Sequence, residues 1–197
     1  MPKIKIKASS IANLTDARYF AAMMVDFMGY QLDLSHDERL SAAEFHGIKA
    51  WVEGPEIVAQ VGKTPKALLA EIYSAEDYHW ISCDMDNDDY DNKNVIKEFR
   101  PKSIQDLAHE SFRSDHIYQL RLQDISEQDL YQGGLLTELC AQHQVFVSAP
   151  SQEQNIRKLI EDIQPYGIDL LGGTEEKVGF KSYEELDVFF EHLEIYT

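Results

Sequence analysis

The sequence has few cysteines, few basic residues and no long apolar run. Its two cysteines, Cys83 and Cys140, show no CxxC spacing and no cysteine–histidine pattern, which argues against a disulfide framework or a structural zinc site. Eighteen basic against thirty-five acidic residues give a net charge of −17, and such a field repels nucleic acid and anionic lipid.

No apolar stretch approaches the ~18 residues needed to span a bilayer. The opening segment, MPKIKIKASS, alternates lysine with isoleucine and lacks the apolar core of a signal peptide. We therefore expect a cytoplasmic protein with neither a nucleic-acid partner nor a membrane partner.

Strand-like and helix-like segments alternate along the chain. The segments with strand character are residues 3–7, 27–32, 56–61, 78–83, 95–99, 117–122, 145–148 and 168–171. Helical patterns follow Asn13, and then occupy residues 41–46, the stretch after Thr64-Pro65, and residues 103–112, 135–143, 153–163 and 183–193. Eight strands favour a closed (βα)8 TIM barrel over an open doubly wound sheet.

The length of 197 residues predicts a single barrel domain over residues 1–197 that has lost part of one unit. Barrels of this kind usually have roughly 250 residues. The segment between the fourth and fifth strands is too polar and too short for a regular helix, so we expect an acidic loop over residues 84–91 in its place.

The acidic loop also has the D-x-D-x-D opening of a calcium loop, at Asp84, Asp86 and Asp88. An EF-hand requires Gly at position six and Glu at position twelve, where this chain has Asp89 and Val95. The pattern favours a solvated loop, and no metal site is predicted.

Three segments carry a resemblance to a known family. The C-terminal run PYGIDLLGGTEEKVGFKS, at residues 165–182, resembles PYGVDVSSGVE followed by a PGxKD turn. Residues 95–100, VIKEFR, resemble VIKAIR, and residues 13–17, NLTDA, resemble NLEDA. These motifs are those of phosphoribosylanthranilate isomerase, and the resemblance is strongest at the two ends of the chain.

The resemblance implies an Amadori isomerisation of N-(5'-phosphoribosyl)anthranilate, an aldose, to a ketose in tryptophan biosynthesis, with no metal and no organic cofactor. A general acid protonates the ribose ring oxygen, and a general base then removes the C2 proton. The family's base is the Cys of a KICG motif that ends the first strand, and its acid is an Asp that ends the sixth. Both project from the C-terminal face of the barrel.

The position of the base falls on Ser9 or on Lys7, depending on the alignment. Counting back from Asp16 without gaps places Ser9 at the Cys, whereas aligning IKIK with the family's VKIC places Lys7 there. A serine hydroxyl needs an adjacent base near pH 7, and Lys7 would need burial to lower its pKa.

The position of the acid is also altered. The ungapped count from Asp115 places Leu120 at the family's Asp, and leucine has no proton to donate. Asp124, four residues later, becomes the candidate acid if the register slips, although an Asp in such a loop is also a common turn or cap residue.

The substrate-binding positions are retained in part, and the residues predicted to bind substrate are Lys7, Arg39, Gly172 and Gly173. Gly172 and Gly173 follow the eighth strand and match half of a glycine-rich phosphate cradle, in which backbone N–H groups bind the oxygens. After the seventh strand residues 148–151 read SAPS instead of a Gly pair, and the proline removes one donor. Arg39 aligns, across a one-residue deletion, with the family's Arg that faces the anthranilate carboxylate.

Two functions remain open from the sequence. The first is a divergent working isomerase that acts on a small phosphorylated sugar–aromatic substrate. The second is a catalytically inactive barrel that binds a phosphorylated ligand or a protein. The sequence does not predict the oligomeric state.

Overall fold

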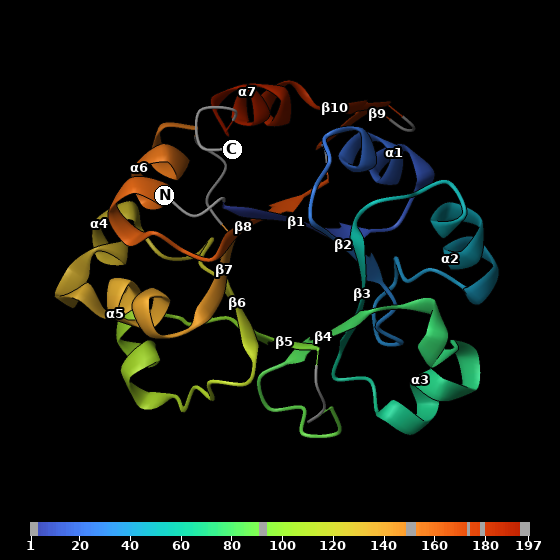
Figure 1. The fold of residues 1–197 in the computed structure, drawn as a ribbon, viewed down its shortest axis with the longest axis horizontal. Coiled ribbons are helices and arrows are strands. Elements are labelled where there is room, and N and C mark those ends of the chain that lie inside the picture. The colour runs from blue at the N-terminus through green and yellow to red at the C-terminus, as the bar shows by residue number, and fades with distance from the viewer. Residues whose placement is uncertain (1–3, 91–93, 149–152, 173, 178–179, 194–197) are drawn as a thin grey trace.

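The chain forms a ring of parallel strands surrounded by helices (Figure 1). The computed structural model describes residues 4–90, 94–148, 153–172, 174–177 and 180–193. The eight barrel strands are β1 (Lys5–Ile11), β2 (Phe27–Gln31), β3 (Glu56–Gly62), β4 (Trp80–Asp84), β5 (Val95–Phe99), β6 (Ile117–Arg121), β7 (Gln144–Ser148) and β8 (Gly167–Leu171). The predicted (βα)8 barrel is confirmed.

The ring closes where β8 pairs with β1. Their parallel register aligns Lys5 with Gly167, Lys7 with Asp169 and Ser9 with Leu171. The first and last strands of the barrel therefore bring their lysine, serine and aspartate side chains to one seam.

Seven α-helices are described, and none of them is long and apolar enough to cross a membrane. They are α1 (Leu14–Ala22), α2 (Ala42–Lys49), α3 (Lys66–Ile72), α4 (Glu127–Leu130), α5 (Leu135–Gln142), α6 (Glu153–Ile163) and α7 (Glu184–Leu193). The Asn13 side chain caps α1, and Ser41 forms a capping box with Glu44 at the start of α2.

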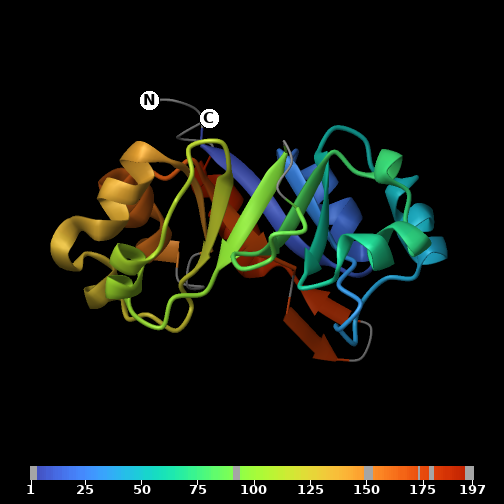
Figure 2. The ribbon, with the colours of Figure 1, turned by 90° about the horizontal axis from the view of Figure 1, so that it is seen from below.

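Two connections differ from the prediction. Residues 103–112 were expected to be helical, but only a 3₁₀ helix forms there, at Ile104–His109. Its buried residues, Ile104 and Leu107, are three apart, which matches the three-residue turn of a 3₁₀ helix. After β8 the chain forms an unpredicted hairpin, β9 (Thr174–Lys177) with β10 (Phe180–Ser182), that projects beyond the barrel where β8 ends (Figure 2).

The acidic connection between β4 and β5 contains no helix in its described residues, 85–90 and 94, as predicted. It is anchored to the start of α3. The buried Tyr90 hydroxyl donates a hydrogen bond to the Thr64 carbonyl over 3.1 Å, and Asn87 Nδ2 donates to the Gly62 carbonyl over 3.0 Å. These contacts fold the loop back against the ring.

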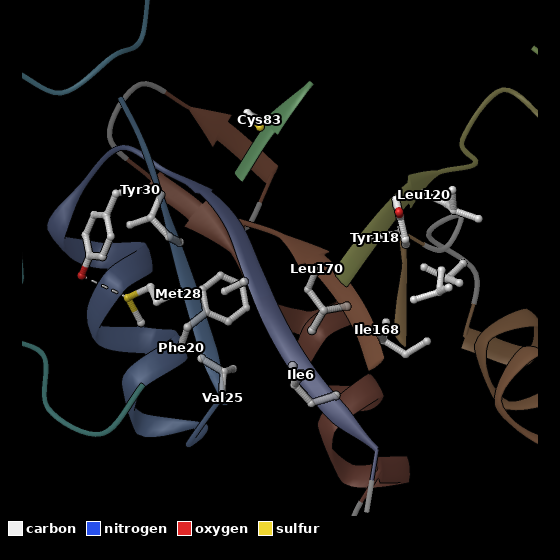
Figure 3. Close-up of a cluster of buried hydrophobic side chains, with 14 of the residues drawn as sticks. Ile6, Phe20, Val25, Met28, Tyr30, Cys83, Tyr118, Leu120, Ile168 and Leu170 are labelled. Atoms are coloured by element: carbon white, nitrogen blue, oxygen red, sulfur yellow. Dashed lines mark hydrogen bonds between the residues drawn. The ribbon is translucent and has the colours of Figure 1, made fainter. Parts of the chain in front are cut away.

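Apolar side chains fill two separate regions. The larger lies between the ring and its helices, and Figure 3 shows Ile6, Ile168 and Leu170 of the closing strands within it. The smaller forms a floor inside the ring, built from Phe27, Val58, Ile96, Ile117 and Phe146 with Trp80 and Tyr166 packed against it. The lumen above this floor is therefore left to the polar inward-facing residues.

A methyl group at Gly167 should disrupt the seam. An added Cβ would lie 2.4 Å from Phe146 Cε1 and 2.5 Å from the Lys5 carbonyl oxygen, which belongs to the backbone. We expect Gly167→Ala to lower the free energy of unfolding by about 1–3 kcal/mol, as overpacking does. Gly47→Ala is the matched control, because an added Cβ there meets no atom within 4 Å inside α2, and it should stabilise by roughly 0.5–1 kcal/mol. Urea unfolding measures both, and equal effects would contradict the steric argument.

Candidate active site

A layer of polar side chains occupies the lumen above the apolar floor. Successive side chains of a strand point to opposite faces of the sheet, so every second residue of each barrel strand faces the interior. The buried polar residues that hydrogen-bond there are Lys7, Ser9, Gln60, Ser82, Glu98, Gln119, Arg121, Ser148 and Asp169. They come from seven of the eight strands.

The carboxylate of Asp169 is the centre of the β1–β8 side of this layer. Its Oδ1 accepts hydrogen bonds from the Ser9 hydroxyl and from Lys7 Nζ, the latter over 3.0 Å. Its Oδ2 accepts from Gln119 Nε2 over 2.9 Å and from the Ser148 hydroxyl over 2.7 Å. The carboxylate thus holds side chains of β1, β6 and β7 in fixed positions.

Lys7 is a fully buried lysine whose side chain is 0% exposed. Its Nζ donates to Ser9 Oγ and to Asp169 Oδ1. Burial lowers the pKa of Lys7 below its ordinary value, although the charges of Asp169 and Glu98 act in the opposite direction. Its ammonium form is therefore a stronger acid than that of an exposed lysine.

The carboxylate of Glu98 is the centre of the opposite side. It accepts from Arg121 Nε over 3.0 Å, from the Ser82 hydroxyl over 3.0 Å and from Gln60 Nε2 over 3.3 Å. Burial alone would raise the pKa of Glu98, but the charges of Arg121 and Lys7, together with the hydrogen bonds from Arg121 and Ser82, outweigh burial and hold it at about 2. Glu98 is thus ionised at neutral pH.

The two halves are joined and balanced in charge. Arg121 Nη1 lies 3.7 Å from Asp169 Oδ2, and the two cations Lys7 and Arg121 match the two anions Glu98 and Asp169. Buried charges are tolerated only when they are paired and hydrogen-bonded. In the described part of the chain, the lumen therefore holds four charges with no net excess of either sign.

The structure brings together both candidates for the base. Ser9 and Lys7 contact each other, so the two alternative alignments point to one place in the barrel. Ser10, directly after Ser9, has a φ of 57°, a left-handed conformation that favours glycine. The KICG motif of the family has its Gly at this position when Ser9 is aligned with the Cys, which supports the ungapped alignment.

The strand that should carry the acid presents different side chains. Leu120 packs in the outer core between the ring and the helices (Figure 3), so its side chain faces away from the lumen. Arg121, the next residue, is the one that enters the lumen at this end of β6. Asp124 is exposed in the connection after β6, and its role as an acid remains a prediction.

Of the residues predicted to bind substrate, Lys7 belongs to this cluster, whereas the described contacts of Arg39 and Gly172 are made elsewhere. Arg39 is exposed and interacts with the hydroxyl of Tyr73, which follows α3. An added Cβ on Gly172 would lie 2.7 Å from Oδ2 of the buried Asp16, so the turn after β8 packs tightly on the start of α1. Gly173 and residues 149–151 lie outside the described residues, and the roles of Arg39, Gly172 and Gly173 stay predictions.

Neither cysteine can replace the family's catalytic thiol. Cys83 faces the outer core, and burial raises its pKa to about 11. Burial also raises the pKa of Cys140, on α5, to about 12. A thiol of such high pKa is protonated near pH 7 and is a poor base.

Sequence reasoning missed seven of the nine lumen residues: Gln60, Ser82, Glu98, Gln119, Arg121, Ser148 and Asp169. Each is a polar residue at an inward-facing position of a largely apolar strand. Assigning alternate residues of each predicted strand to the interior would have identified these positions. Glu98 carried a second signal, because it stands at the Ala of the VIKAIR motif.

Comparison with known proteins supports the resemblance that the motifs indicated. No family model matches the chain. The N-(5'-phosphoribosyl)anthranilate isomerase of Aquifex aeolicus (strain VF5) is 28% identical over 203 residues, covering 94% of this chain and 96% of that protein. The resemblance to phosphoribosylanthranilate isomerases is thus confirmed along most of the chain.

Solved structures agree on the fold. Monomers of the dimeric phosphoribosylanthranilate isomerase from Thermotoga maritima superpose with a TM-score of 0.75 at 15% identity, over 97% of this chain and 98% of that one. The enzyme from Thermus thermophilus gives a TM-score of 0.72 at 17% identity, over 98% and 100%. At such identities the likeness establishes the barrel fold.

Low pH should lower the free energy of unfolding because it protonates Glu98. Because its pKa is about 2 in the folded protein and 4.5 is the ordinary value, its stabilising effect is complete above pH 5 and is lost as the pH falls toward 2. The difference corresponds to about 3 kcal/mol of unfolding free energy. Urea unfolding between pH 6 and pH 3 should show this loss in the natural protein and a smaller loss in Glu98→Gln. The same exchange at exposed Glu110 is the control, and an unchanged pH dependence in Glu98→Gln would refute the assignment.

Proposed function

We propose that this protein is a phosphoribosylanthranilate isomerase that converts a phosphorylated N-ribosyl aromatic amine to its ketose. The observation that carries the proposal is the Lys7–Ser9–Asp169 cluster at the seam of β1 and β8. It lies on the strand where the family places its base, in a barrel that aligns with a curated isomerase over 94% of the chain.

Ser9 and Asp169 together act as the base. The Ser9 hydroxyl donates its hydrogen bond to Asp169 Oδ1, so the carboxylate is placed to take that proton while the serine oxygen removes the C2 proton of the substrate. A neighbouring base is what a serine needs in order to accept a proton near pH 7. Asp169 thereby supplies what the loss of the cysteine removed.

Lys7 acts as the acid that protonates the ribose ring oxygen. It is the ammonium group closest to Ser9, and burial lowers its pKa toward the range in which it transfers a proton readily. Asp124 is the alternative acid, from the connection after β6. Gly172, Gly173 and Arg39 are proposed to bind the phosphate and the aromatic carboxylate.

A second candidate is a barrel that binds a sugar phosphate without converting it. One observation favours it: the side chains of Lys7 and Asp169 are 0% exposed and bonded to each other, so a substrate must displace those contacts. Under either function the partner is a small molecule, and we propose that the protein acts in the cytoplasm.

Turnover of phosphoribosyl anthranilate, followed by the loss of its fluorescence, tests the proposal. Ser9→Ala and Asp169→Asn should each lower kcat by about 10²-fold or more, the usual contribution of a positioned proton-transfer group. Ser114→Ala, an exposed serine on the connection before β6, is the matched control and should retain the activity.

Three outcomes separate the assignments. Full activity in Ser9→Ala would remove Ser9 from the mechanism. Loss of activity in Asp124→Asn but not in Lys7→Arg would assign the acid to Asp124. Binding of the substrate without turnover in the natural protein would establish the second candidate.

A further inference from the structure

The amine of Lys7 has the surroundings of a nucleophile as well as those of an acid. We propose that Lys7 Nζ adds to the carbonyl carbon of an open-chain hydroxy aldehyde or hydroxy ketone, such as a sugar phosphate, and forms an imine. The inference deepens the proposed function and rests on it only for the site of the substrate, the lumen above the polar layer.

The position of Nζ favours approach from the C-terminal mouth. The backbone of Lys7 pairs with that of Asp169 in the register of β1 and β8, and Ser9 is the next inward-facing residue of β1. Its Nζ contacts Ser9 Oγ, so the side chain rises along β1 toward the mouth. The reactive nitrogen therefore lies nearer the opening than its own backbone does.

Asp169 can carry the protons that imine formation requires. Its Oδ1, 3.0 Å from Nζ, accepts one ammonium proton and leaves a neutral amine. The nitrogen lone pair forms the C–N bond while the carbonyl oxygen takes that proton from Asp169. The carboxylate then removes one proton from the added nitrogen, which gives a neutral carbinolamine. Asp169 returns this proton to the hydroxyl, the C–O bond breaks to release water, and the nitrogen lone pair forms the C=N bond, so ammonium and carbonyl yield a protonated imine and one water molecule.

A free acceptor beside Asp169 indicates that the ligand carries hydroxyl groups. Gln119 is fully buried, and its Nε2 donates to Asp169 Oδ2 over 2.9 Å. Its Oε1 accepts no hydrogen bond from the described part of the chain. Such an acceptor is costly to leave unpaired, and the hydroxyl of a bound polyol would satisfy it.

Two other lysines of the ring lack these surroundings. Lys97 is buried on β5, but its Nζ donates to the Asn87 carbonyl over 2.5 Å, and among the described residues no carboxylate is hydrogen-bonded to it. Lys5 pairs with Asp26 over 2.6 Å, and this hydrogen bond raises its pKa and keeps it protonated. Burial lowers the pKa of Lys7, which favours the neutral amine that attacks a carbonyl.

Reductive trapping tests the inference on the full chain. The protein is incubated with ribose 5-phosphate and sodium cyanoborohydride near pH 7, and peptide mapping by mass spectrometry locates the reduced adduct. We expect Lys7 to be modified first and ahead of the exposed lysines. Modification confined to exposed lysines would overturn the inference, and this readout needs no variant.

Variants make the test sharper. Lys7→Arg keeps the charge beside Asp169 but forms no stable reducible imine, so the adduct should disappear, while Lys97→Arg, the matched buried control, should keep it. Asp169→Asn should slow trapping at Lys7 by about 10²-fold, as loss of a proton-transfer group does. A rate unchanged in Asp169→Asn would refute the role given to the carboxylate.

The outcome is distinguishable from that of the proposed function. An adduct on Lys7 without turnover of phosphoribosyl anthranilate would support the inference and refute the isomerase. Turnover with no adduct on Lys7 would support the isomerase and overturn the inference.

Discussion

The ion pair between Lys7 and Asp169 is the interaction on which the interior of this barrel depends. Both side chains are 0% exposed, and removing either charge from water is costly unless the partner is present. The partners stand on the first and the last strands of the ring, in register across the seam. The two charges can therefore pair only when the seam is closed, and opening the seam would leave each of them without this partner.

The second buried pair extends this dependence around the ring. Glu98 stands where the related motif has alanine, and Arg121 enters the lumen at the end of the strand that carries an aspartate in the family. Either residue alone would leave an unpaired charge in the interior, whereas the two together leave none. Glu98 on β5 and Arg121 on β6 thus make physical sense as a pair that forms part of one ionic network.

The alternation of strand and helix, the eight strands and the lost helix before β5 were all predictable, because they depend on period and length. The site was harder to predict because a strand has a period of two, and one residue of slippage moves a side chain to the opposite face. On β6 an ungapped count selects Leu120, which packs outside, and the lumen position belongs to Arg121. On β1 both alignments select inward-facing residues, Lys7 and Ser9, and these two side chains contact each other.

A ligand for this barrel must replace contacts that the protein already makes with itself. Ser9, Lys7 and Asp169 are bonded to one another, so an apolar molecule would gain little and leave all three unsatisfied. A polyol offers hydroxyl groups that donate to Asp169 and Gln119 and accept from Lys7, and so exchanges one set of hydrogen bonds for another. In the lumen the two cations already match the two anions. Replacing these hydrogen bonds by those of a polyol's hydroxyl groups therefore brings no additional charge into the interior. The same contacts that hold the ring closed therefore select for a hydroxylated ligand.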